Sequence, residues 1–291
     1  MKRSHFLLLA LFNVFWSGIM SVNKELEPSL SVTSLVTLRF GLAALGFALV
    51  WRWLPGPSPD QGVWIRASLM GVTVFVLGQR LQVYGNFLGT AGNSSVLMGF
   101  EPVLTSVAAA WFLRERIPWT RWGGFALCLL GLAFLNQAWG ADFRWSGLWA
   151  SAIFVSSFLC ESVYSILGKP LGARASPYRV TAIGLIAATV VNLLIDGGRT
   201  VSEAARLGPY QWALLSYLAF LCTMAGYVLW LVILQDTEVN LVALTVFVQP
   251  VAGVMIAAFW LHESTHWGQL WGTLAIGAGL LVGFLAERRD R

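Results

Sequence analysis

Charged residues are scarce in this chain of 291 residues, because Asp, Glu, Lys and Arg together make up only 11% of it. A soluble domain has about a quarter of its residues charged. Hydrophobic residues, in contrast, make up 57% of the chain. The shortage of charge excludes an ordinary soluble domain. It predicts an all-α polytopic membrane protein, because the apolar runs are too long for the roughly ten-residue strands of a membrane barrel.

Cysteine is also rare. The three cysteines, Cys128, Cys160 and Cys222, each lie within an apolar run. An odd count without paired spacing excludes a disulfide framework and a cysteine-based metal cluster. The chain also lacks a Walker-type phosphate-binding loop and any polar region large enough for a nucleotide-hydrolysing domain. We therefore expect no cofactor and no metal.

Ten windows of about 20 mainly apolar residues are long enough to cross a bilayer as helices. They cover roughly 4–22, 32–54, 64–84, 91–113, 120–137, 146–168, 177–196, 210–234, 240–261 and 267–286. If the N terminus is cytoplasmic, the inner segments hold thirteen Lys and Arg residues and the outer loops hold four. This bias predicts a multi-pass protein of the cell inner (plasma) membrane with both termini cytoplasmic. It also explains the net charge of +5 without a nucleic-acid partner.

The chain repeats itself after 148 residues. Residues 101–135 and 249–283 share ten identities without a gap, including the Leu-x-Glu that ends at Glu115 in one copy and at Glu263 in the other. Ten spans divide into two units of five, and an odd number of crossings makes the second unit run opposite to the first. We therefore expect two inverted five-helix repeats, residues 1–137 and 146–286, which is a common basis of alternating access.

Several stretches resemble the EamA module of the drug/metabolite transporter superfamily. They are residues 13–17 (NVFWS), 38–40 (LRF), 92–95 (GNSS), the pair Glu101-Pro102, and 113–116 (LRER). The resemblance covers nearly the whole chain as two modules. It implies ten helices around a central cavity and movement of a small-molecule substrate across the lipid bilayer by alternating access. The second module departs from the pattern, because Gln249 stands where the first has Glu101.

Polar and aromatic residues within the predicted spans are candidates for a substrate pathway, since an ionisable side chain at the bilayer centre requires a partner or a wet cavity. Glu101 could bind a substrate ammonium or carry a coupling proton. Alternatively, it only hydrogen-bonds the backbone that Pro102 leaves open. Arg39 could bind a substrate carboxylate or pair with Glu101. The other candidates are Asn13, Trp16, Gln79, Gln82, Ser94, Glu161, Tyr164, Tyr227, Trp230 and Gln249.

These features predict a secondary carrier for a small organic metabolite, amino acid-like or amphipathic. Export is expected from the resemblance alone. An importer of a flat cofactor-like molecule such as riboflavin is the alternative within the class, and a channel is the rival without alternating access. Protons are the candidate coupling ion, and both a monomer and a homodimer fit the sequence.

Residues 262–266 spell H-E-x-x-H, the zinc-protease pattern. That chemistry requires both histidines on one helical face and a third ligand. Here the motif crosses the predicted end of a span, and the only other histidine, His5, belongs to the opposite membrane face. The equivalent residues 114–118 (RERIP) contain no histidine. We therefore expect no enzyme, and an intramembrane zinc protease remains the alternative from another class.

Overall fold

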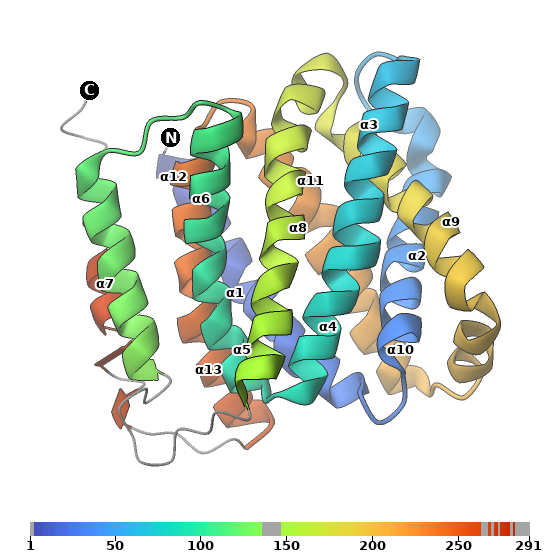
Figure 1. Ribbon diagram of the computed structural model, residues 1–291. Coiled ribbons are helices and arrows are strands. Elements are labelled where there is room, and N and C mark those ends of the chain that lie inside the picture. Colours follow the sequence, from blue (N-terminus) through green and yellow to red (C-terminus); the bar gives the residue numbers. More distant parts are fainter. Residues whose placement is uncertain are drawn as a thin grey trace.

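The chain folds into a bundle of helices, and no strand occurs in the part that the structure describes (Figure 1). This computed structural model describes residues 3–135, 147–262, 267–268, 271–272, 274–279 and 282. Within them, seven helices are long and apolar enough to cross a membrane: His5–Leu26, Val32–Trp53, Gln61–Leu88, Trp149–Arg174, Pro177–Ala204, Pro209–Leu234 and Val239–Trp260. The prediction of an all-α polytopic membrane protein is confirmed to this extent. Of the predicted span 267–286, residues 269–270, 273, 280–281 and 283–286 lie outside the described part of the chain.

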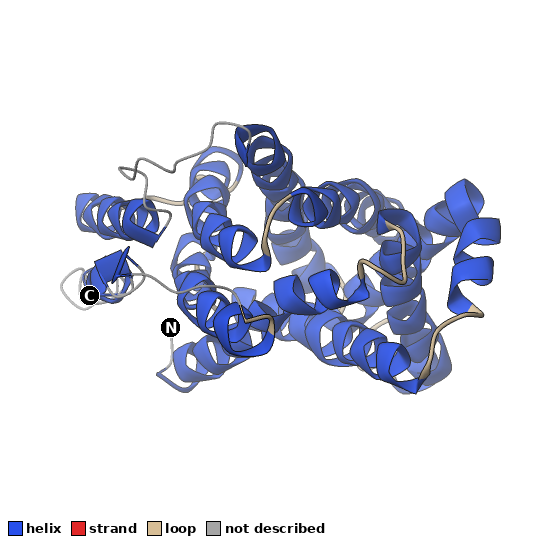
Figure 2. Cartoon of the chain, turned by 90° about the horizontal axis from the view of Figure 1, so that it is seen from below, coloured by secondary structure: helices blue, strands red, loops and turns tan. Residues whose placement is uncertain are grey.

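The helices follow one another with short connections. The first half contains α1 (Arg3–Leu26), α2 (Val32–Val50), η1 (Trp51–Trp53), α3 (Gln61–Val72), η2 (Thr73–Gly78), α4 (Gln79–Leu88), α5 (Ala91–Leu97), η3 (Met98–Phe100), α6 (Glu101–Phe112) and α7 (Trp119–Leu135). The second contains α8 (Gly147–Arg174), α9 (Pro177–Ala204), α10 (Pro209–Ser216), η4 (Tyr217–Ala225), α11 (Gly226–Leu234), α12 (Val239–Ala243), η5 (Leu244–Phe247) and α13 (Val248–Trp260). Here η2 and η4 are π-helices, and η1, η3 and η5 are 3₁₀-helices. Figure 2 shows the bundle end-on, with α-helices on all sides.

Polar residues at the bundle ends determine where helices begin. The carboxylate of Asp60 accepts a hydrogen bond from the backbone N–H of Val63 at 2.8 Å and so caps α3. Arg174 donates to its other oxygen at 3.0 Å. The backbone hydrogen bond from Val63, assisted by the charge of Arg174, lowers the pKa of Asp60 below its ordinary value of 3.8.

Small residues allow helices to approach closely at the centre. A Cβ atom on Gly71 of α3 would overlap the backbone of Gly184 in α9. Membrane helices commonly pack through such small residues because lipid supplies no hydrophobic drive for their association. In contrast, a Cβ atom on Gly198 would meet nothing within 4 Å.

Helix boundaries in the two halves lie 148 residues apart. The run α5–η3–α6 extends from Ala91 to Phe112, and the run α12–η5–α13 extends from Val239 to Trp260. Each run is followed two residues later by a residue with positive φ, Arg114 at 56° and His262 at 55°. Because α5 packs on α13 and α6 packs on α12, the two runs are antiparallel. In Figure 1, α6 accordingly rises from α5, whereas α13 descends from α12.

Candidate functional site

A cavity of about 570 Å³, counting its open mouth, lies between helices of both halves. Ten of the twelve predicted pathway residues line it: Trp16, Arg39, Gln79, Gln82, Glu101, Glu161, Tyr164, Tyr227, Trp230 and Gln249. The other lining residues, Ile19, Met20, Met98 and Ser165, are not among the twelve. Ile19 and Met98 are apolar residues in apolar runs, so no sequence signal distinguishes them from ordinary core residues.

Asn13 and Ser94 are the two predicted residues that are absent from this lining. Asn13 is fully buried, and its Oδ1 accepts a hydrogen bond from Gln249 Nε2 at 2.6 Å. Its Nδ2 donates to Thr245 Oγ1 at 3.1 Å. Asn13 thus lies behind the cavity wall and holds a lining residue in place. Ser94 is buried in α5, and a role for it in the pathway remains a prediction.

A chain of hydrogen bonds runs along the cavity lining and begins at Arg39, whose side chain is buried in α2. Its Nε donates to Thr223 Oγ1 at 2.9 Å, and its Nη1 donates to Gln79 Oε1 at 3.1 Å. Gln79 Nε2 donates to Glu161 Oε1, and the hydroxyl of Tyr227 donates to Glu161 Oε2 at 3.2 Å. The guanidinium therefore does not pair with Glu101, which was one of the two roles that the sequence allowed.

The chain of hydrogen bonds includes one residue inside a π-helix and one directly after the other π-helix. Gln79 directly follows η2, and Thr223 lies inside η4, where its hydroxyl donates to Leu218 O at 2.8 Å. π-Helical turns are rare and occur frequently at functional sites. The sequence analysis missed Thr223, since an isolated threonine in an apolar run gives no signal of its own.

Glu101 is the first residue of α6 and lines the cavity. Its carboxyl group has no hydrogen-bond or ion-pair partner among the residues that the structure describes. Among the described residues, Glu101 therefore does not make the hydrogen bond to backbone near Pro102 that the alternative hypothesis required. The reason lies in the helix break at η3, which places Pro102 in the first turn of α6, where its missing N–H costs little.

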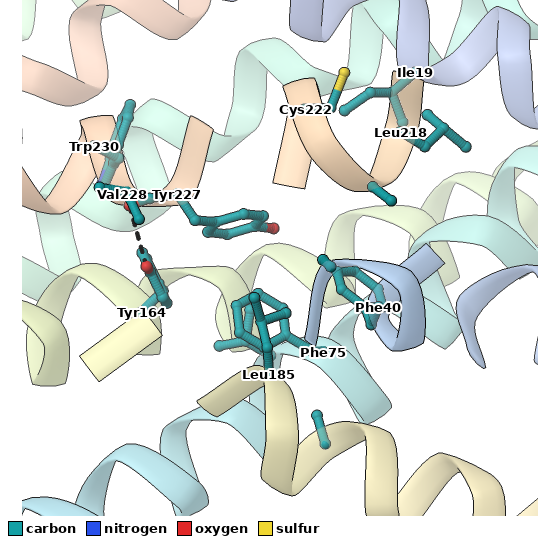
Figure 3. Close-up of a cluster of buried hydrophobic side chains, with 14 of the residues drawn as sticks. Ile19, Phe40, Phe75, Tyr164, Leu185, Leu218, Cys222, Tyr227, Val228 and Trp230 are labelled. Atoms are coloured by element: carbon teal, nitrogen blue, oxygen red, sulfur yellow. Dashed lines mark hydrogen bonds between the residues drawn. The ribbon is translucent and has the colours of Figure 1, made fainter. Parts of the chain in front are cut away.

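The aromatic residues have their polar ends bonded to protein. Trp16 Nε1 donates to Cys222 O at 2.7 Å, and Trp230 Nε1 donates to Ser165 Oγ at 2.9 Å. The hydroxyl of Tyr164 donates to Tyr227 O at 3.1 Å, and the two tyrosine rings meet edge to face with their centroids 4.8 Å apart (Figure 3). Hydrogen bonds thus hold these rings at the cavity wall, which combines aromatic side chains with a few charged groups.

No cluster of three or more His, Cys, Asp or Glu residues that could hold a metal occurs among the described residues. Of the H-E-x-x-H motif, residues 263–266 lie outside the described part of the chain. His262 is exposed and has a φ of 55°, so the α13 helix does not continue through it.

These features define a multi-pass membrane protein with a charged cavity between its helices, which is the architecture of a transporter for small molecules. The EamA-like transporter family matches residues 3–137 and 148–285. The chain belongs to this family, whose members are transporters and not enzymes. Its partners accordingly include a small-molecule substrate and the lipid bilayer.

Relatives and a solved structure agree with this assignment. A probable terminal-alkyne amino-acid exporter of Streptantibioticus cattleyicolor is 25% identical over 290 residues, which cover 97% of this chain and 95% of the relative. A probable amino-acid metabolite efflux pump of Salmonella typhimurium is 28% identical over 211 residues, 69% of this chain and 71% of the relative. One crystal structure aligns over 100% of both chains with a TM-score of 0.72 at 16% identity, which shows the fold alone.

Proposed function

We propose that the chain is a secondary carrier that exports an amino acid-like metabolite across the inner membrane by alternating access. In this proposal it has ten transmembrane helices in two inverted five-helix repeats, residues 1–137 and 146–286, and both termini are cytoplasmic. The observation that carries the proposal is a cavity built from both halves that contains Arg39 and an acid, Glu101, which has no partner among the described residues. An amino acid presents the complementary pair of charges.

The common 148-residue spacing supports the inverted repeat. It relates the ends of α5–η3–α6 to those of α12–η5–α13, and it relates Arg114 to His262. The antiparallel packing of the two runs is the arrangement that an inverted repeat requires. Glu101 and Gln249 occupy equivalent positions in these runs, and both line the cavity.

Ion pairs at one end of the bundle support the proposed orientation. The loop that contains Asp60 is joined there to Arg174, and the loop that contains Glu115 is joined to Lys169. These residues belong to segments that the sequence analysis assigned to the cytoplasmic side. A concentration of Lys and Arg at one end is typical of the cytoplasmic side.

The direction of transport rests on the relatives, of which one is named an exporter and another an efflux pump. Import of a flat cofactor-like molecule such as riboflavin is the rival, because the aromatic wall of Trp16, Tyr227 and Trp230 also suits a flat ring. Glu101, which is unpaired in the described part of the chain, favours the amino acid-like substrate, since a neutral ring system does not require a carboxylate.

The proposal is tested with Glu101→Gln in proteoliposomes. Gln keeps the shape and one oxygen acceptor, but it neither titrates nor supplies charge. We expect this variant to insert into the membrane and to unfold like wild type. Its uptake of the amino acids that wild type transports should fall at least about tenfold, the scale of a lost charged contact, or should lose its pH dependence. The matched control is Glu27→Gln, which changes an acid at the end of α1 and should transport normally.

Two results would contradict the proposal. Wild-type transport by well-folded Glu101→Gln would assign Glu101 to structure. Uptake of riboflavin by the wild-type protein, without uptake of any amino acid, would select the rival substrate.

A further inference from the structure

Gln79 lies between the two opposite charges of the cavity chain. Its side chain is only 2% exposed, and it accepts from Arg39 through Oε1 while it donates to Glu161 through Nε2. A primary amide has one acceptor oxygen and one donor nitrogen. This orientation of the amide therefore satisfies both charges at once, and the reverse orientation would oppose both.

Arg39 and Glu161 form no direct ion pair in the described structure, although opposite charges attract strongly where the dielectric constant is low. The backbone next to Gln79 is anchored from outside the cavity. Arg80 donates to Asn192 Oδ1 at 2.8 and 3.0 Å, and Asn192 Nδ2 donates to Phe75 O in η2 at 3.3 Å. The Gln79 amide is thus held at a fixed point between the two charges.

The separation leaves part of the guanidinium available. Arg39 uses Nε for Thr223 and one Nη1 hydrogen for Gln79. Its Nη2 has no hydrogen-bond partner among the residues described here, and the guanidinium lies over the Phe40 ring with Cζ 5.0 Å from the ring centroid. A guanidinium binds a carboxylate through two parallel N–H···O bonds, which gives both energy and orientation. A direct pair with Glu161 would use these donors and neutralise the charge within the protein.

We propose that Gln79 is a positioning residue that keeps Arg39 away from Glu161, so that the guanidinium binds the carboxylate of the transported solute. The inference rests on the proposed carrier function and adds the residue that keeps Arg39 available for the carboxylate end of the solute. Glu161 is held by Gln79 and Tyr227, and Glu101 is left for the positive end of the solute.

The positional part of the proposal is tested by the structure of Gln79→Leu without any ligand. Leu fills similar space but cannot bond to either charge. The matched control is Gln82→Leu, because Gln82 lies one turn further along α4, lines the same cavity and has no hydrogen-bond partner among the described residues. We expect Arg39 and Glu161 to approach within an ion-pair distance of about 4 Å in Gln79→Leu only. An unchanged separation in Gln79→Leu would overturn the proposal.

The chemical part is tested by binding of the twenty protein amino acids and, for each one that binds, the amine that lacks its carboxylate. We expect Gln79→Leu to weaken the amino acid about tenfold or more, the usual scale for a lost charge-assisted contact. The amine should change by much less, and Gln61→Leu, at an exposed residue outside the cavity, should keep the wild-type ratio of the two affinities. An equal loss for both ligands would mean a merely structural role and would refute carboxylate recognition.

The two tests separate this inference from the proposed function. If wild type binds no amino acid, the substrate class is wrong, and the ligand-free structure of Gln79→Leu still decides whether Gln79 separates the charges.

Discussion

Removing the carboxylate of Glu115 should destabilise the fold more than removing any other acid at its end of the bundle, the end where Asp60 pairs with Arg174. Glu115 is only 8% exposed, and its two oxygens accept four hydrogen bonds. They come from Lys169 Nζ at 2.9 Å, the backbone N–H groups of Val239 at 2.9 Å and Asn240 at 3.2 Å, and Asn240 Nδ2 at 2.8 Å. One side chain after α6 thus fixes the start of α12 and the end of α8.

The magnitude follows from the groups that Glu115→Ala leaves without an acceptor. Each buried donor that loses its partner costs about 1–3 kcal/mol, but such costs do not add fully. Lys169 is 27% exposed and keeps a bond to Thr237 O at 2.9 Å, so water and this carbonyl offset part of its loss. We therefore expect a loss of about 3 kcal/mol, the lower end for breaking a buried ion pair. Glu115→Gln should cost about half as much, since it keeps one acceptor oxygen.

The assay is thermal unfolding of the purified variants in one detergent at one heating rate. For a chain of this size, about 3 kcal/mol corresponds to a fall in Tm of roughly 6–12 °C. The control is Glu238→Ala, because Glu238 is 55% exposed and makes a single 3.4 Å contact with Arg121. Glu238 lies at the surface, and the buried Arg121 has a further interaction besides this long contact, so its loss should cost at most about 1 kcal/mol. Equal Tm values for Glu115→Ala and Glu238→Ala would refute the reasoning.

Three further changes test the packing, the orientation and a helix cap. Gly71→Ala should destabilise the protein by about 1–3 kcal/mol or more through overlap with α9, whereas Gly198→Ala should be neutral or slightly stabilising, as unfolding of both will show. A cysteine at Ser202 should react with an impermeant thiol reagent in intact cells, and one at Arg116 only after permeabilisation; the reverse pattern would invert the proposed topology. Because the pKa of Asp60 is lowered in the folded protein, its carboxylate stabilises the fold at pH values above the ordinary pKa of 3.8. This stabilisation is lost as the pH falls through the lower pKa of the folded state. The Tm difference between wild type and Asp60→Ala should therefore shrink as the pH is lowered from 5 to about 3, and a difference independent of pH would contradict this.

Most residues of the candidate site could be predicted from the sequence, because they are polar residues within predicted membrane spans. Lipid excludes unpaired polar groups, so an Arg, Glu or Gln inside an apolar run must face protein or a cavity. This rule identified Arg39, Glu101 and Glu161, and the helical spacing of amide side chains identified Gln79; the structure brings all four together around one cavity.

The partners of these residues could not be predicted, because they depend on contacts between distant segments. Helical spacing indicates which face a residue occupies but not which neighbour it meets, so Asn13 lies behind Gln249 rather than in the cavity. The break of the predicted span 91–113 at η3 was also missed. A local change of helix type depends on packing and leaves no distinct residue pattern, and the same holds for the two π-helices.

Counterflow tests the central claim, that the chain is a carrier, most directly. Proteoliposomes that contain the purified protein are preloaded with an unlabelled amino acid that it binds, and the labelled amino acid is added outside. A carrier that exposes its site to one side at a time should accumulate label transiently above its equilibrium level, and Glu101→Gln should not. Entry of label that only rises to equilibrium in the wild type, without the transient excess, would contradict alternating access and indicate a channel.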